Sequence, residues 1–509
     1  MPLFNRRAAY TLMIVSVRFL IVAIIPVLVG TMIGVQRFEG RVLNQILLAL
    51  MSVVISPVVI AILWSLFVGP LWGRTPSPLQ PLPEWMMLSS KSGAQTSLMF
   101  VDALITMGIA AVVGGTAFMA VMRGRAIRRS VTLAGVGVWL IGLFLTLASP
   151  LHTFDLPYVL TQGGPANSTL TVMLYLYQNA FQRFNFGPAA AVATPLLVLA
   201  VVMSIFIWAV ITFFRLRLIV VPTSRPTGTS GLLSLLSLPM LILMGLPLVG
   251  LMLWGARLVS NNPFVSDSEQ AIDTMKLFMN TISGPWLAIW AIQIPAMYLA
   301  GMSLGFLKPI HRIVSHILFL VLLLIAFIPA EALMVQWFQM AREARALNTT
   351  FIPGFAWLSG TFSLVVFKMF FEGALESFRA MRQTRTVSDA FLRAVFLPSL
   401  PIVLLVGAVL SFASVQSLLW PMIVSQQLYT IPLQLLNLRS QFTAGSDKMA
   451  ELALSFVSTL ALIFVPIFAL LHIFVLDRLA IVAGPPIDSD LLIMGTEKPK
   501  RDADMRGDM

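Results

Sequence analysis

PAAAVATPLLVLAVVMSIFIWAVITFF, residues 188–214, contains no charged side chain. An α-helix needs about 20 apolar residues to cross the hydrocarbon core of a bilayer, which is about 30 Å thick. The stretch exceeds this minimum. It therefore predicts a transmembrane helix.

The same pattern recurs along the whole chain. Of the 509 residues, 58% are hydrophobic and only 11% are charged, a balance expected when lipid is the solvent, because a soluble globule could not cover so much apolar surface. We therefore expect an all-α polytopic protein of the cell membrane. The eleven predicted spans are 11–35, 43–69, 98–122, 131–149, 188–214, 231–256, 280–306, 313–338, 352–371, 395–419 and 449–476.

Lys and Arg set the predicted orientation, because positive charges in short loops resist translocation. Most of these residues fall on the cytoplasmic side if the loop with Arg123, Arg125, Arg128 and Arg129 is placed there. The opposite orientation would reverse this ratio, so we reject it. An odd number of spans then places the basic N-terminal end outside, so either that end is translocated or the first span is a partial one.

The polar segment 216–230 contains Pro, Gly, Ser and Thr and separates two sets of spans. It is predicted to be a cytoplasmic linker. The first half, 1–215, has about five spans, and the second half, 231–479, has about six. The segment 480–509 is polar and is predicted to be a disordered cytoplasmic tail.

Composition argues against several classes of function. The chain has no cysteine, which excludes disulfides, thiol catalysis and thiolate metal sites. Its four histidines do not cluster, so no metal or cofactor is expected. The basic residues are scattered between apolar stretches, so nucleic acid is not an expected partner. No phosphate loop ending in Gly-Lys-Ser or Gly-Lys-Thr is present, so the chain is not an ATPase and is not expected to be an enzyme.

One external segment stands out: FDLPYVLTQGGPANSTLTVMLYLYQNAFQRFNFGPAAA, residues 154–191. Gly163-Gly164-Pro165 predicts a sharp turn, because glycine adopts backbone angles closed to other residues and proline fixes the exit. Apolar residues at helical spacing follow and predict a short amphipathic helix against the membrane face. Taken alone, these residues indicate an ordered external loop or a structural cap over the bundle.

This segment resembles the external signature of sugar-type permease subunits of ATP-binding cassette (ABC) importers, the family that includes the maltose transporter. The matched residues with a predicted external role are Asp155, Tyr158, Thr161, Gly163, Gly164, Pro165, Tyr177, Phe181 and Gly187. Further matches are Phe154, Val159, Leu160, Ser168, Thr169, Ala180, Phe186, Ala189 and Ala190.

The second half resembles the partner permease of the same importers. The similar positions are Asn280-Thr281, Ile328-Pro329, Leu347-Asn348-Thr349 and the Trp420-Pro421 that ends a degenerate motif. The resemblance implies a type I ABC importer fold in which both permease subunits are fused in one chain. The first half lacks the family's first helix, which accounts for five spans rather than six.

In this family each half has a cytoplasmic loop, with Glu-Ala-Ala and then Gly, that docks in a cleft of the ATPase subunit. The first equivalent here is basic and has no acidic residue. The second, Glu372 to Pro398, keeps the amphipathic length but not the motif. The loops have either drifted while still docking or no longer couple. The predicted coupling residues are Arg123, Arg125, Arg128, Arg129, Phe378, Arg379, Met381, Arg382 and Arg385.

Few charged residues fall inside the predicted spans, among them Arg18, Asp102, Glu331 and Lys368. Such groups are functional candidates, because burying them unpaired is costly. Asp102 and Lys368 lie near span ends, where snorkelling or capping explains them. Glu331 is therefore the candidate pathway residue.

The resemblance implies a translocation subunit that receives a sugar-like solute from an extracytoplasmic solute-binding protein, while separate ATPase subunits hydrolyse ATP. Two other hypotheses remain. An ion-coupled secondary transporter would need acidic or histidine relays near the bilayer centre. A permease-derived structural or assembly subunit would follow if coupling has been lost.

Overall fold

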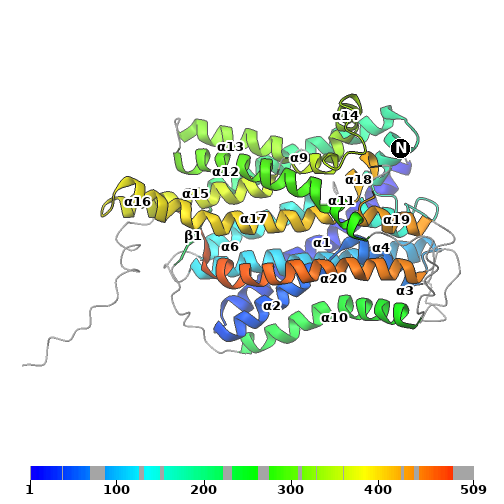
Figure 1. The fold of residues 1–509 in the computed structure, drawn as a ribbon, viewed down its shortest axis with the longest axis horizontal. Helices are drawn as coiled ribbons and strands as arrows, with labels where there is room; N and C mark the ends of the chain where they lie inside the picture. Colours follow the sequence, from blue (N-terminus) through cyan, green and yellow to red (C-terminus); the bar gives the residue numbers. More distant parts are fainter. Residues whose placement is uncertain are drawn as a thin grey trace, which may run out of the picture.

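The computed structural model describes residues 2–36, 38–68, 86–124, 131–148, 154–221, 232–261, 274–307, 312–327, 330–358, 360–425, 429–440 and 446–484. Within these ranges the chain is an elongated bundle of helices, most of them aligned with the long axis of the molecule (Figure 1). The only strands described are two short ones near one end of the bundle. The expected all-α polytopic architecture is confirmed.

Seven helical segments are long and apolar enough to cross a membrane. They belong to α1 (Pro2–Gly34), α4 to α5 (Lys91–Arg123), α9 (Phe186–Phe214), α10 (Leu232–Asn261), α11 to η8 (Thr274–Leu307), α16 to α17 (Val387–Val415) and α20 to η12 (Ser446–Arg478). Several contain π-helical turns, for example η2 (Ala110–Gly114) and η10 (Leu392–Phe396), which continue the helix without breaking it.

An eighth span is counted if the bent pair α2 (Phe38–Val54) and α3 (Pro57–Phe67) crosses as one unit. The expected span over 43–69 is thus a pair of helices with a bend of 71° at the break between them. Ser56 is extended and Pro57 opens α3. The residue before a proline disfavours the helical region, so the break falls where the sequence carries Ser-Pro.

The remaining three predicted spans are weaker as single transmembrane helices. α6 (Val131–Ala148) and α13 (Arg312–Phe327) contain only shorter apolar segments. The predicted span 313–338 divides into α13 and α14 (Ala330–Glu343). The predicted span 352–371 divides into a 3-10 turn, η9 (Ile352–Trp357), and α15 (Thr361–Arg382), whose second half is charged.

Two strands join the ends of the predicted halves. β1 (Arg217–Val220) pairs antiparallel with β2 (Leu479–Val482), with Arg217 opposite Val482 and Val220 opposite Leu479. β1 lies within the predicted linker, and β2 enters the predicted tail. Ordered structure thus extends into both segments, because each strand supplies the backbone partners of the other.

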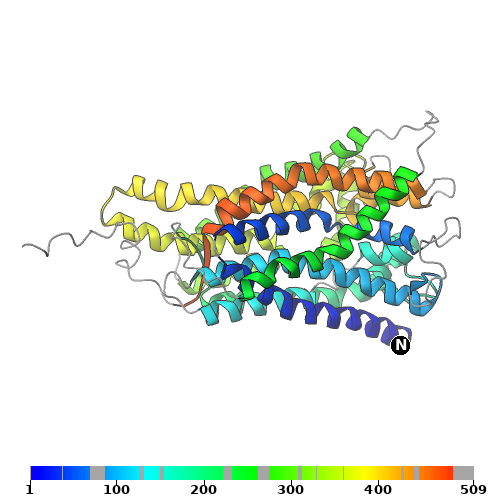
Figure 2. The same cartoon turned by 90° about the horizontal axis from the view of Figure 1, so that it is seen from below.

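Helices from the two predicted halves pack against each other in matching pairs. α2 contacts α20, and α13 contacts α9. α5 (Gly115–Arg123) contacts β2, and α15 contacts β1. α10 lies on the outside of the bundle, against α2, α3 and α20 (Figures 1 and 2). Each half therefore completes the packing of the other.

Candidate external signature and coupling hairpin

The external signature folds as two short helices joined by a tight turn. α7 (Asp155–Thr161) ends at Gln162, whose φ is 51°, and α8 (Val172–Tyr177) continues into η5 (Gln178–Gln182). The amide of Gly164 donates to the carbonyl of Thr161 at 2.9 Å, and the Thr169 hydroxyl donates to the Gly164 carbonyl at 2.9 Å. The predicted turn and the predicted short helix after it are both confirmed.

The two glycines of this turn have different requirements. Gly163 has φ +88°, and a Cβ there would lie 3.0 Å from Cδ1 of Leu170. Gly164 has no such backbone angle, and a Cβ would lie 3.4 Å from the Thr161 carbonyl oxygen, an ordinary contact. The sequence motif does not distinguish the two glycines, whereas the backbone angle requires glycine at 163.

We expect Gly163→Val to disrupt the turn and Gly164→Val to have the smaller effect. A β-branched residue at a positive φ is strained by about 1–3 kcal/mol. Limited proteolysis of the 154–185 segment in purified variants measures this directly. Faster cleavage of Gly164→Val than of Gly163→Val would contradict the assignment.

Four aromatic residues of the signature, Phe154, Tyr158, Tyr177 and Phe181, form a cluster. Phe154 stacks on Tyr158, and Tyr158 meets Tyr177 edge to face. Burial raises the pKa of both tyrosines. Phe181 extends the cluster to Phe338 of α14, with 5.9 Å between ring centroids. The signature is therefore packed against the second half.

The other signature residues divide into buried and exposed. The Thr161 hydroxyl is buried and paired with that of Thr169. Asp155 lies in the first turn of α7, where its negative charge interacts favourably with the helix dipole. Pro165 is partly buried in the turn. Gly187 is exposed, and a Cβ there would meet nothing within 4 Å, so packing does not require glycine at this position.

Two contacts between the halves pair signature residues with residues that no sequence motif marks. Nη2 of Arg439, in α19 (Ile431–Ser440), donates to the Leu160 carbonyl at 2.7 Å. The Tyr177 hydroxyl lies 3.9 Å from the sulfur of Met422, in α18 (Leu419–Val424). No local pattern marks these residues, because each partner lies in the opposite half.

The second coupling segment is a helical hairpin that projects at one end of the bundle. α15 runs out to residue 382, and α16 (Val387–Phe391) begins the return (Figure 1). The exposed tip includes Arg379, Arg382, Arg385 and Val387. The predicted amphipathic helix is present here.

Two predicted docking anchors of this hairpin face inward instead. The ring of Phe378 lies 5.1 Å from that of Phe306, which also contacts Phe391. Met381 is partly buried against the same core. Helical spacing correctly put both residues on one apolar face, but that face packs on the chain's own bundle. Val387, 56% exposed, is the apolar side chain left at the tip.

Charge pairing orders the return of the hairpin. Asp389 accepts hydrogen bonds from Arg385 at 2.7 Å and from Arg393 at 2.8 Å. Of the three predicted tip arginines, Arg385 is therefore engaged within the hairpin, while Arg379 and Arg382 are exposed.

The first coupling segment lies largely outside the described residues, which exclude Arg125, Arg128 and Arg129. Arg123 ends α5 and pairs with Asp477, which also binds Arg41 at 2.9 Å. The side chain of Arg123, one of the predicted coupling residues, therefore lies in a largely buried charge cluster. Asp477 comes from the second half, so the cluster joins the halves.

Arg18, Asp102 and Lys368 are paired, which corrects the view that Asp102 and Lys368 snorkel or cap. Nε of Arg18 donates to Asp102 at 2.7 Å. Lys368 donates to Glu372 at 2.8 Å and lies over the ring of Phe319. The side chain of Glu331 lies outside the described residues. No group of three metal-ligating residues occurs in the part of the chain that the structure describes.

The curated proteins to which this chain is similar share one description, that of a transporter permease. The chain is 38% identical over 66 residues to a protein of Caldicellulosiruptor sp. (strain Rt8B.4) described as an ABC transporter permease, covering 13% of this chain and 47% of the relative. It is 44% identical over 52 residues to a protein of Pyrococcus horikoshii with the same description, covering 10% and 18%. The chain is related to ABC transporter permeases.

A third permease relative is the sulfoquinovosyl glycerol transport system permease protein of Agrobacterium fabrum, 35% identical over 60 residues, 12% of this chain and 20% of the relative. The chain spans less than half the length of the curated permeases it matches. No family model matches the chain. No solved structure matches it either.

Proposed function

We propose that this protein is the translocation subunit of an ABC importer, with both permease halves fused in one chain. The observation that carries the proposal is that contacts between the two halves occur in equivalent pairs. In each pair, the second contact joins the counterparts of the two elements that make the first. A solute pathway would then lie between the halves, as in a dimer of separate permeases. Separate ATPase subunits would supply the energy on the cytoplasmic side.

The strand pair supports an internal two-fold relation. Arg217 pairs with Val482, and Val220 pairs with Leu479. Position 479 lies 262 beyond 217, and position 482 lies 262 beyond 220. Shifting each residue by 262 positions into the other strand therefore turns the first pair into the second. An antiparallel pair of equivalent strands is what a two-fold axis between them produces.

The external contacts follow the same relation. Position 439 lies 262 beyond 177, and position 422 lies 262 beyond 160. Tyr177 therefore contacts Met422 just as Arg439 contacts Leu160. The contact of α2 with α20 and the contact of α13 with α9 also agree with this relation. In this scheme α10 has no counterpart among the described helices of the first half.

The partners of the proposed importer follow from the two ends of the bundle. The α15 to α16 hairpin would dock in an ATPase subunit. The signature between 154 and 187 would face an extracytoplasmic solute-binding protein. A sugar-like solute is supported by the resemblance of the signature and by the name of the Agrobacterium relative.

Affinity purification of the tagged protein tests the function. We expect an ATPase with a nucleotide-binding signature to copurify, and ATP hydrolysis to drive uptake in proteoliposomes. Recovery of other membrane proteins without an ATPase would favour a structural subunit. Uptake abolished by collapsing the proton gradient, but unaffected by ATP depletion, would indicate a secondary transporter.

Single cysteines in this cysteine-free chain test the orientation. We expect Gln182→Cys to react with an impermeant thiol reagent added outside intact cells, and Ser388→Cys to react only after permeabilisation. Both side chains are exposed. Gln182 follows Phe181, which contacts α14, and Ser388 lies in α16, at the opposite end of the bundle (Figure 1). The assignment rests on the distribution of Lys and Arg. Labelling of Ser388→Cys from outside would reverse it.

A further inference from the structure

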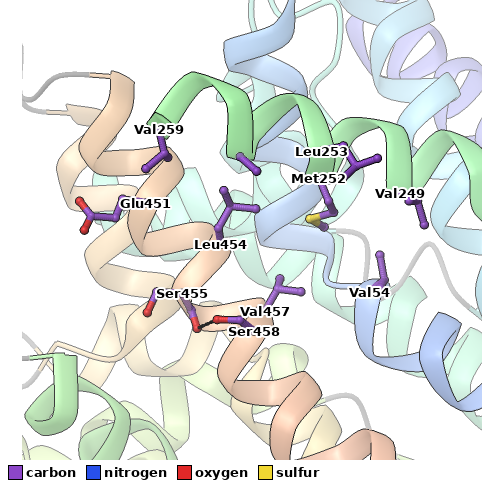
Figure 3. A pocket seen from close by; sticks show the side chains of 11 residues that line it. Val54, Val249, Met252, Leu253, Val259, Glu451, Leu454, Ser455, Val457 and Ser458 are labelled. Atoms are coloured by element: carbon purple, nitrogen blue, oxygen red, sulfur yellow. Dashed lines mark hydrogen bonds between the residues drawn. The ribbon is translucent and has the colours of Figure 1, made fainter. Parts of the chain in front are cut away.

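A groove of about 600 Å³ lies on the outer side of the bundle, between α10, α20 and the end of α2 (Figure 3). One wall comes from α10 and is apolar. The opposite wall comes from α20 and carries polar groups. The residues that decide the argument are Val249, Met252 and Leu253 on α10, and Glu451, Ser455 and Ser458 on α20.

The groove opens toward lipid. Its two main walls belong to the membrane-spanning segments Leu236–Arg257 and Lys448–Arg478. Leu253 is 61% exposed and Val249 is 46% exposed. Because the surrounding medium at this depth is hydrocarbon, an acyl chain is the apolar molecule most available to fill the space.

The polar wall is unusual for a lipid-facing surface. Glu451, Ser455 and Ser458 are spaced by four and three residues, so they follow one face of α20. The Ser458 hydroxyl is satisfied by the Ser455 carbonyl at 3.0 Å. Glu451 is exposed and makes no hydrogen bond or ion pair among the described residues. A carboxylate at a membrane boundary is stabilised by a cation.

The length of the groove matches one leaflet. Along α10 it extends from Val249 to Val259, about 15 Å at 1.5 Å per residue. Half of a hydrocarbon core about 30 Å thick has the same depth. Glu451 lies near the first turn of α20 and Val259 near the end of α10, so the charged end of the groove is at the bilayer surface.

We propose that this groove binds a lipid, with one acyl chain along α10 and a primary ammonium headgroup hydrogen-bonded to Glu451. No lining residue is cationic, so the lining itself holds no charged partner for an anionic headgroup. A quaternary ammonium lacks N–H donors, so it forms the weaker complex.

Native mass spectrometry of the purified full chain with phosphatidylethanolamine, phosphatidylcholine or phosphatidylglycerol tests the site. We expect one phosphatidylethanolamine to be retained by the wild type. Loss of a hydrogen bond to a charged group costs about 1.5–3 kcal/mol, so Glu451→Gln should bind it at least about tenfold more weakly. Glu343→Gln removes an exposed carboxylate outside the groove and should bind as the wild type does.

A second pair of variants tests the chain-binding wall. Leu253→Trp fills the groove and should abolish retention, whereas Leu243→Trp, on the exposed face of the same helix and outside the groove, should not. Equal retention by these two variants, or unchanged binding by Glu451→Gln, would overturn the proposal. So would a photo-crosslinker at position 253 that captures a membrane protein in place of lipid.

Discussion

Asp477→Asn is expected to lower the free energy of unfolding by about 3–5 kcal/mol, the cost of breaking a buried ion pair from one side. Asp477 is 7% exposed and binds both Arg41 and Arg123. Without its charge, two buried guanidinium groups would face each other with no acidic partner in the cluster. Thermal unfolding in lipid nanodiscs measures the effect.

The matched control is Asp389→Asn, which removes a carboxylate that also binds two arginines but in an exposed position. Surface ion pairs contribute about 0–1 kcal/mol, so this variant should unfold close to the wild type. If both variants unfold alike, the Asp477 cluster does not hold the halves together.

Val387→Asp is expected to reduce the recovery of a copurifying ATPase by more than about tenfold. A central apolar anchor at an interface is worth about 2 kcal/mol or more, and a carboxylate in its place would be buried without a partner. The proposal that the hairpin docks in an ATPase selects Val387 because it is the exposed apolar residue of the tip. The measurement is the ratio of ATPase to permease after affinity purification.

Two further variants separate docking from folding. Val387→Leu keeps the apolar contact and should retain the ATPase. Phe378→Ala should retain it as well but unfold at a lower temperature, because its ring packs on Phe306. If Phe378→Ala loses the ATPase at unchanged stability, Phe378 is the residue that docks in the ATPase. Full recovery with Val387→Asp would remove the tip from the docking surface.

The external signature could be predicted to a large extent because its turn and helices depend on local chemistry. Gly163 is required by its own backbone angle, and α8 follows from apolar spacing. The contacts of Tyr177 with Met422 and of Arg439 with Leu160 could not be predicted. Their partners lie more than 240 positions apart, and no periodicity links residues at that distance.

The coupling hairpin illustrates the same limit at shorter range. Helical spacing placed Phe378 and Met381 on one apolar face of α15, and the structure agrees. Spacing does not say what covers an apolar face, because a partner protein and the chain's own bundle offer equivalent hydrophobic surface. Only the position of Phe306, brought against α15 by the fold, decided between them.

By itself, the sequence determined that this is an all-α membrane protein and where most of its apolar segments lie, because transfer of about 20 consecutive apolar residues into lipid depends on composition alone. The tertiary structure decided which charges are functional candidates. Arg18 and Asp102 are 84 positions apart and Arg123 and Asp477 are 354 apart, yet each pair is in contact. Coulomb attraction falls with distance in space, and only the packed helices fix that distance.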